Sequence, residues 1–246
     1  MSGAVIWYYP GSTRATPAAS LSVQEILFSE PFGALEPEPD HTAAVAESVS
    51  GVRVSQSLRN RLRVRLVIDR VTDPDLMAAL HTLESHLQRG GVIAVANEVT
   101  KAWAGYLLHT PNKGDTVFRT GGNPWGSLSG STQQIAAGDQ VWVSSRSPEA
   151  FRDVGVVASA AFASVDRVTL ETGMAYAPQL TPCLARHRDF YPAMVMESPG
   201  TPVVTVVADG RAVSVDVALV EHLPTLASGA KRPAGYYLRS GQGGWF

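Results

Sequence analysis

The residues best suited to nucleophilic catalysis form no complete motif in this chain. Cys183 is the single cysteine, and His187 follows it four residues later. A cysteine nucleophile needs its histidine close in space rather than in sequence, so this spacing is weak evidence for a hydrolase. Residues 126–130 (GSLSG) resemble the G-x-S-x-G nucleophile elbow, but the central residue is Leu128. These patterns therefore give little support to an enzyme, and a hydrolase that uses Cys183 with a distant histidine is kept as an alternative.

The sequence evidence for a metal or nucleotide site is as weak as that for a catalytic nucleophile. His81 and His86 lie five residues apart in a predicted helix, whereas two ligands on one helical face are three or four residues apart. We expect both side chains to occupy exposed polar positions. The remaining histidines have no companion motif, and the sequence contains no G-x-x-x-x-G-K-[ST] phosphate-binding loop. The sequence thus predicts no metal and no cofactor.

Arginines crowd one segment of the chain and are its most informative chemical feature. Those at positions 61, 63 and 65 alternate with apolar residues, so they share one face of a predicted strand. Phosphate binding is disfavoured, because no aromatic residues are interleaved with them and the chain has a net charge of -2. Carboxylates are the more usual partners, and an acidic stretch of this molecule or of a neighbour could supply them. The predicted interface residues are Arg61, Arg63, Arg65, Glu36, Glu38 and Asp40, together with the terminal Trp245 and Phe246.

The elements that must position these residues centre on a predicted strand–helix–strand unit at residues 61–97. Apolar residues alternate through residues 62–68, which is typical of a strand with one buried face. Thr72 or Asp73 can cap the helix, and a Gly-Gly pair can end it before a second strand at residues 92–96. Four leucines at helical spacing predict the buried face of the helix: Leu76, Leu80, Leu83 and Leu87.

Short runs of β-forming residues between turn residues predict that the rest of the chain is mainly β. Residues 30–41 hold three prolines and four carboxylates, so we expect a solvated loop there rather than a central strand or a helix. An Asp-Gly pair predicts a hairpin over residues 203–220. Further strands are expected at residues 4–9, 23–28, 43–54, 140–144, 154–159 and 165–170.

The predicted fold class is mainly β with one main helix (α+β). We expect a β-sandwich with the helix packed across it, plus a small inserted β-barrel or β-meander module. The predicted order is the first part of the sandwich at residues 1–105, the inserted module at 106–180, return strands at 181–223 and an extended C-terminal arm at 224–246.

The composition suits a protein with much of its surface covered. Of 246 residues, 45% are hydrophobic and only 17% are charged. A low charge content is expected when neighbouring subunits cover the surface, and a large core in a loop-rich β protein would explain it equally well. No stretch indicates a signal peptide, and none approaches the roughly 20 apolar residues of a membrane span. We expect a protein made in the cytoplasm, with no membrane span and no specific nucleic-acid partner.

Several stretches taken together resemble one group of viral structural proteins. They are LESHLQRGGVIAVANE followed by KAWAGYL, AAGDQVWVSS followed by VDRVTLE, then RHRDFYPAMVM and VSVDVALVEHL. In this order they are similar to distal-tail and related baseplate proteins of long-tailed, siphovirus-like bacteriophages. The resemblance covers most of residues 52–223. The chain departs from the family's pattern in the size and placement of the module at residues 134–172 and in its long C-terminal tail.

The resemblance implies a structural virion protein with no catalytic residues to carry over. It implies a homohexameric ring that joins the tail tube protein to the tail hub, other baseplate proteins and receptor-binding or fibre proteins. The expected location is the tail of the virion, after synthesis in the bacterial cytoplasm. Two other functions fit the sequence. One is a carbohydrate-binding module that stacks sugars on exposed Trp103, Trp125 and Trp142, and the other is a head–tail connector or tail-terminator protein.

Overall fold

The computed structural model describes residues 3–8, 24–47, 53–107, 109, 111–120, 135–144, 152–161, 166–175, 184–207 and 210–221. The side chains of residues 38–47 and 53–61 lie outside this description, although their backbone is included. Four residues with a predicted role lie wholly outside the described part of the chain: Trp125, Cys183, Trp245 and Phe246.

The larger of two antiparallel sheets in the described residues contains both strands of the predicted strand–helix–strand unit. Its strands follow the order β2-β1-β5-β12-β14-β4-β3, and β13 also pairs with β14. Residues far apart in sequence thus become neighbours, with β12 and β14 lying between β5 and β4. The strands are β1 (Val5–Tyr8), β2 (Gln24–Leu27), β3 (Ala34–Glu47), β4 (Arg53–Val71), β5 (Val92–Ala96), β12 (Phe190–Met196), β13 (Val204–Val207) and β14 (Ala212–Glu221).

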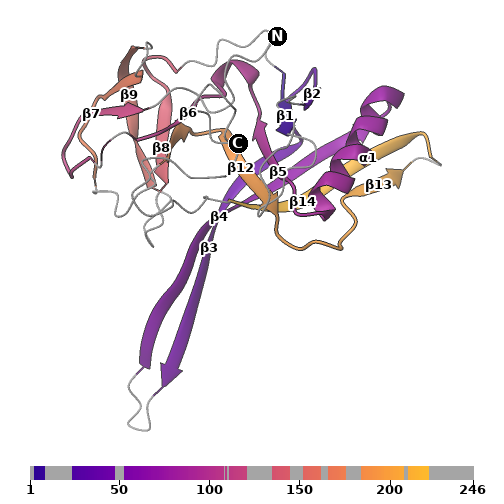
Figure 1. Ribbon diagram of the computed structural model, residues 1–246, viewed down its shortest axis with the longest axis horizontal. Coiled ribbons are helices and arrows are strands. Elements are labelled where there is room, and N and C mark those ends of the chain that lie inside the picture. The colour runs from indigo at the N-terminus through magenta and orange to yellow at the C-terminus, as the bar shows by residue number, and fades with distance from the viewer. Residues whose placement is uncertain are drawn as a thin grey trace.

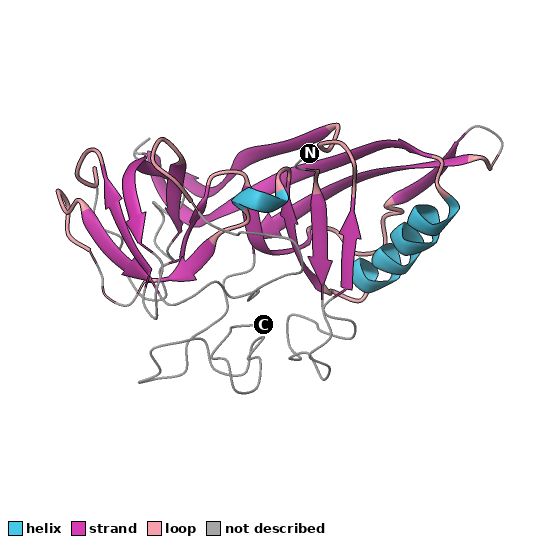
Figure 2. Cartoon of the chain, turned by 90° about the horizontal axis from the view of Figure 1, so that it is seen from above, coloured by secondary structure: helices cyan, strands magenta, loops and turns pink. Residues whose placement is uncertain are grey.

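Helix α1 (Pro74–Gln88) packs against this sheet, as Figure 2 shows from above. Asp73 caps it, because its carboxylate accepts hydrogen bonds from the backbone N–H groups of Asp75 (2.9 Å) and Leu76 (3.1 Å). Three of the four predicted leucines are buried and join the core of the sheet, and Leu76 packs at its edge. Each fully buried leucine stabilises the fold by about 1.5–3 kcal/mol. The predicted cap and buried face of the helix are confirmed.

The prediction that both helix histidines are exposed is wrong for one of them. His81 is exposed, whereas His86 is buried and stacks on Tyr8 with 4.8 Å between the ring centroids. Its Nε2–H donates to the carbonyl oxygen of Val92 at 3.1 Å. Gly91 makes room for the imidazole, since a side chain at that position would overlap it. The helix stripe of leucines is thus extended by a histidine whose polar atom has a backbone partner.

The smaller sheet follows the order β6-β11-β8-β9-β10-β7 and has its own apolar core. It lies beside the larger sheet in Figure 1. Leu107, which follows the edge strand β6, forms a single bridge with Thr120 of the other edge strand β7, and the described residues form no closed barrel. Its elements are β6 (Ala104–Tyr106), β7 (Val117–Thr120), β8 (Gln140–Ser144), β9 (Arg152–Ala161), β10 (Asp166–Leu170) and β11 (Leu184–His187), preceded by the short helix η1 (Val99–Lys101). The fold is therefore mainly β with one α-helix in the described residues, as predicted.

The hairpin of β3 and β4 extends well beyond the larger sheet (Figure 1). Strand β14 pairs with β4 only between Arg63 and Val71. Beyond that point the hairpin is a two-stranded ribbon, which we call the arm: residues 40–47 of β3 and 53–61 of β4. The predicted single strand at residues 43–54 is wrong, because this segment is divided between the two strands of the arm.

The prediction of a solvated loop at residues 30–41 is also wrong for most of that segment. Residues from Ala34 onward belong to β3, where Pro37 and Pro39 face Val64 and Leu62 across the ladder. Prolines are tolerated there because β3 is the last strand of the sheet, and an edge strand can turn the missing N–H away from its neighbour. The prolines excluded a central strand but did not exclude an edge strand.

Candidate functional site

The arginines of β4 make ion pairs within the same molecule. Arg63 lies 3.0 Å from the carboxylate of Glu197, which follows β12. Arg65 donates two hydrogen bonds to the carboxylate of Asp216 in β14, from Nε to Oδ1 at 3.1 Å and from Nη2 to Oδ2 at 2.8 Å. These hydrogen bonds hold the pKa of Asp216 below its ordinary value. The predicted pairing of arginine with carboxylate is present, but one carboxylate comes from β14 and the other from the residue after β12, and no pattern in the sequence connects either of them with β4.

The predicted acidic stretch lies on the opposite side of β4. The register of the hairpin sets Glu36 opposite Arg65, Glu38 opposite Arg63, and Asp40 opposite Arg61. Residues directly opposite in an antiparallel pair share one face of the sheet, so the register places these acidic and basic positions next to each other. The structure therefore brings all six predicted residues into one hairpin of one molecule.

Glu197 and Asp216 could not be recognised from the sequence as partners of the arginines. In β14 alternate apolar residues face the core, and Val213, Val215, Val217 and Leu219 are all buried. Asp216 therefore points to the other face, and it is exposed. The alternation placed Asp216 on the outer face, but only the pairing of β14 with β4 places it beside Arg65. That pairing joins residues about 150 positions apart, which no local pattern reports.

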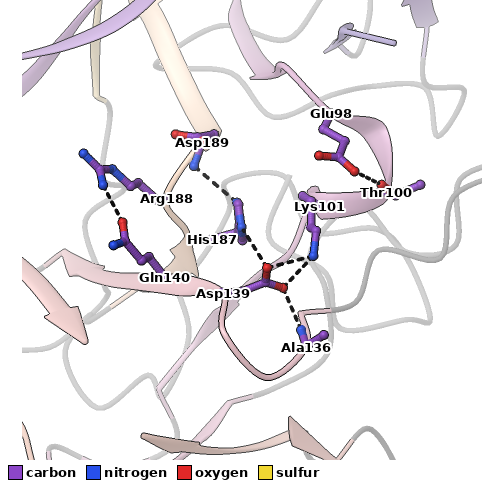
Figure 3. Close-up of polar contacts among 9 residues, drawn as sticks. All are labelled: Glu98, Thr100, Lys101, Ala136, Asp139, Gln140, His187, Arg188 and Asp189. Carbon is purple, nitrogen blue, oxygen red and sulfur yellow. Dashed lines mark hydrogen bonds and ion pairs between the residues drawn. The ribbon is translucent and has the colours of Figure 1, made fainter. Parts of the chain in front are cut away.

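A second polar cluster lies where the two sheets meet, and Figure 3 shows it. Lys101 of η1 donates to both carboxylate oxygens of Asp139 at 2.7 and 2.8 Å. The backbone N–H of Ala136 also donates to Asp139, at 2.7 Å. Nε2 of His187 lies 3.9 Å from the same carboxylate, and Nδ1 accepts from the backbone N–H of Asp189 at 3.3 Å. The cluster joins η1, the turn before β8, and the end of β11.

The electrostatics of this cluster favour a fixed ion pair. Burial opposes ionisation of Asp139, but the hydrogen bonds from Lys101 and Ala136 outweigh it and hold the pKa of Asp139 below its ordinary value. Burial also lowers the pKa of His187, although Asp139 and Asp189 oppose that shift. The nearby hydroxyl of Thr100 donates to Glu98 at 2.6 Å. The geometry is that of a contact that fastens three segments together.

Arg186 is the most unusual buried group in the described part of the chain. It is fully buried at the end of β11, and burial lowers the pKa of its guanidinium. Nη1 donates to the carbonyl oxygens of Arg188 and Phe190, both at 2.9 Å. The guanidinium carbon lies 4.9 Å from the ring centroid of Trp142 and 4.6 Å from that of Tyr191. Arg186 therefore holds the turn that carries the chain from the smaller sheet into the larger one.

Two of the three tryptophans considered for sugar stacking are unsuited to it. Trp103 is only 1% exposed and Trp142 only 9%. Trp103 belongs to the core of the smaller sheet, and Trp142 covers the guanidinium of Arg186. A sugar ring needs an accessible aromatic face, so the expectation of exposed stacking platforms is wrong at both positions.

Within the described residues, His, Cys, Asp and Glu form no group of three that could hold a metal ion. None of the helices described is long and apolar enough to cross a membrane. Comparisons of the chain with protein-family models and with curated proteins find no match.

Proposed function

We propose that this protein is a structural component of a phage tail tip or baseplate, of the distal-tail type. It assembles into a ring, expected to be hexameric, that joins the tail tube to the hub and to receptor-binding or fibre proteins. In this role it is not an enzyme, and it acts in the virion after synthesis in the bacterial cytoplasm. The proposal starts from the stretches that resemble distal-tail proteins, and the arm is the observation that carries it further.

The arm supports an assembly role because the described residues provide neither a third strand nor a covering layer for it. Between Arg53 and Arg61, β4 pairs with β3, and the described residues provide no third strand beside them. An isolated two-stranded ribbon is marginally stable in water, and three strands or a covering layer are needed for independent stability. A projection of this kind gains its third strand or its cover when it lies on another molecule.

The ion pairs of β4 can hold the part of the strand next to the arm in a fixed position. Arg63 and Arg65 connect the part of β4 next to the arm to Glu197 and Asp216 in the larger sheet. Both pairs are partly exposed, and such pairs contribute modestly to stability, about 0.2–1 kcal/mol each. In the ring they keep the root of the arm at a set position, while the arm makes the contact between subunits. Their role in the proposal is thus to orient the arm.

Imaging of the purified full chain by negative-stain microscopy, together with its mass in solution, tests the proposal. A closed ring is expected, since identical head-to-tail contacts close by cyclic symmetry. A chain that stays monomeric at high protein concentration would remove the basis of the proposal. A head–tail connector or tail terminator would also form rings, so antibody labelling of intact virions distinguishes the two ends of the tail.

A further inference from the structure

The outer edge of β3 is divided into two parts by its prolines. Pro37 and Pro39 have no N–H, and a paired strand accommodates proline only where the N–H would point away from its partner. Their positions therefore fix the phase of β3, in which odd-numbered residues turn their backbone N–H and C=O groups outward. The extra residue at the irregularity of this ladder lies in β4, because Thr42 faces Arg59 and Ala43 faces Ser57. The phase of β3 continues unbroken through the arm.

The part of β3 before the arm, residues 34–39, cannot pair with a further strand at its outer edge, but the arm can. In residues 34–39, two successive outward positions are prolines and lack the donors that a neighbouring strand requires. From His41 to Glu47 the strand contains no proline, and its outward positions are His41, Ala43, Val45 and Glu47. An edge with free N–H and C=O groups is a template for pairing with another strand. The pairing site is thereby limited to one end of one strand.

The other end of the same sheet provides a complementary edge. Strand β2 (Gln24–Leu27) is the last strand on that side of the described sheet and pairs only with β1 there. Its Leu27 is 58% exposed, although leucine is usually buried in a strand. A strand that pairs with β2 would place its side chains beside Leu27 and cover this apolar surface.

From these edges we infer that residues 41–47 of the arm pair with strand β2 of a second copy of this chain. The contact uses two different surfaces of each subunit, so it is head-to-tail and can repeat around a ring. It extends the larger sheet from one subunit into the next by β-augmentation. The inference rests on the proposed ring and specifies which surfaces form it.

A proline substitution at an outward position tests the inference directly. Val45→Pro removes one outward N–H and leaves the ladder between β3 and β4 intact, so the variant is expected to fold normally and remain monomeric. Val45→Thr keeps the N–H and serves as the matched control, which is expected to form rings. Circular dichroism and thermal unfolding of both variants establish that the chain is folded. Rings formed by a folded Val45→Pro variant would overturn the inference and leave the proposed function standing.

Cross-linking of two differently labelled subunits identifies the partner surface. One subunit carries Val45→Cys and the other carries Leu27→Cys, both with Cys183→Ser, and the two are mixed before treatment with a short bis-maleimide. A covalent dimer is expected only in the mixture. Cross-linking of the Val45→Cys subunit with itself would mean that two arms pair with each other and would overturn the assignment to β2. A wild-type chain that never assembles would remove the proposed function as well as this inference.

Discussion

The two halves of strand β4 have opposite surroundings, although the chain runs through them without a break. Between Arg63 and Val67 the strand is paired on both sides, by β14 and by β3, and β14 continues beside it to Val71. Its inward residues Val64, Leu66 and Ile68 are buried there. Between Arg53 and Arg61 the strand has β3 as its neighbour within the described residues. One half is thus held by its own molecule, and the other is the half that we propose a neighbouring subunit holds.

The largest expected effect is a difference in the free energy of unfolding between substitutions in the two halves of β4. Leu66→Ala removes a fully buried side chain from the core and is expected to lower the free energy of unfolding by about 2–5 kcal/mol. Ser55→Ala, in the part of β4 that belongs to the arm, is expected to change the free energy of unfolding by less than about 0.5 kcal/mol. Urea denaturation of both variants measures the difference. Equal destabilisation would contradict the distinction between the halves.

Gly91 provides a second test, which concerns the packing of the end of α1 against the larger sheet. Gly91→Ala places a methyl group against the buried imidazole of His86 and breaks its hydrogen bond to Val92, at an expected cost of about 1–3 kcal/mol. Gly90→Ala meets no atom but has a φ of 77°, so it is the matched control, with an expected cost of about 1 kcal/mol. Adding His86→Ala to Gly91→Ala should recover part of the loss, and strict additivity of the two would contradict the contact.

The pH dependence of stability tests the same contact through protonation. Burial lowers the pKa of His86 from its ordinary value of 6.5. Below that pH the unfolded chain binds a proton that the folded chain resists, so stability is complete above pH 6.5 and is lost as the pH falls toward the folded pKa. His187 contributes with the same sign. His86→Gln should reduce the slope of unfolding free energy against pH between neutral and mildly acidic solution; an unchanged slope would argue against the assignment.

The smallest expected effect lies at the boundary between the two halves. Arg65→Asp breaks the ion pair with Asp216 and places two acids together, with an expected loss of about 0.2–1 kcal/mol. The exchange of both residues, Arg65→Asp with Asp216→Arg, should restore part of the stability, because the ion pair is remade but the new aspartate faces Glu36 across the ladder. If the exchanged chain is stable and still assembles, Arg65 acts by orienting the arm. Loss of assembly in the stable exchanged chain would mean that Arg65 contacts the neighbouring subunit itself.

Local signals in the sequence predicted the held half and its surroundings. Alternation identified the buried face of β4, and Asp73 and the leucine spacing identified α1, because each of these signals depends on neighbours a few residues away. The buried His86 was missed for a different reason. The room for its ring is provided by Gly91 and its hydrogen-bond acceptor by Val92, and this tertiary environment outweighs the usual preference of histidine for the surface.

Contacts between distant segments could not be predicted in the same way. The proline-rich acidic segment became a strand because β4 lies beside it and because it is an edge strand. The cluster of Lys101, Asp139 and His187 comes from three separate segments, and no spacing in the sequence relates them. Among the predicted interface residues the sequence indicated the arginines and an acidic stretch, but only the fold brings Glu197 and Asp216 into ion pairs with Arg63 and Arg65.

The most direct measurement is the mass in solution of the full chain beside that of a chain whose arm is replaced by a short turn between residues 39 and 62. The full chain is expected to form a closed ring of about six copies. The shortened chain is expected to fold with nearly the same thermal stability and to remain monomeric. A full chain that is monomeric at every concentration, or a shortened chain that still forms rings, would contradict the account.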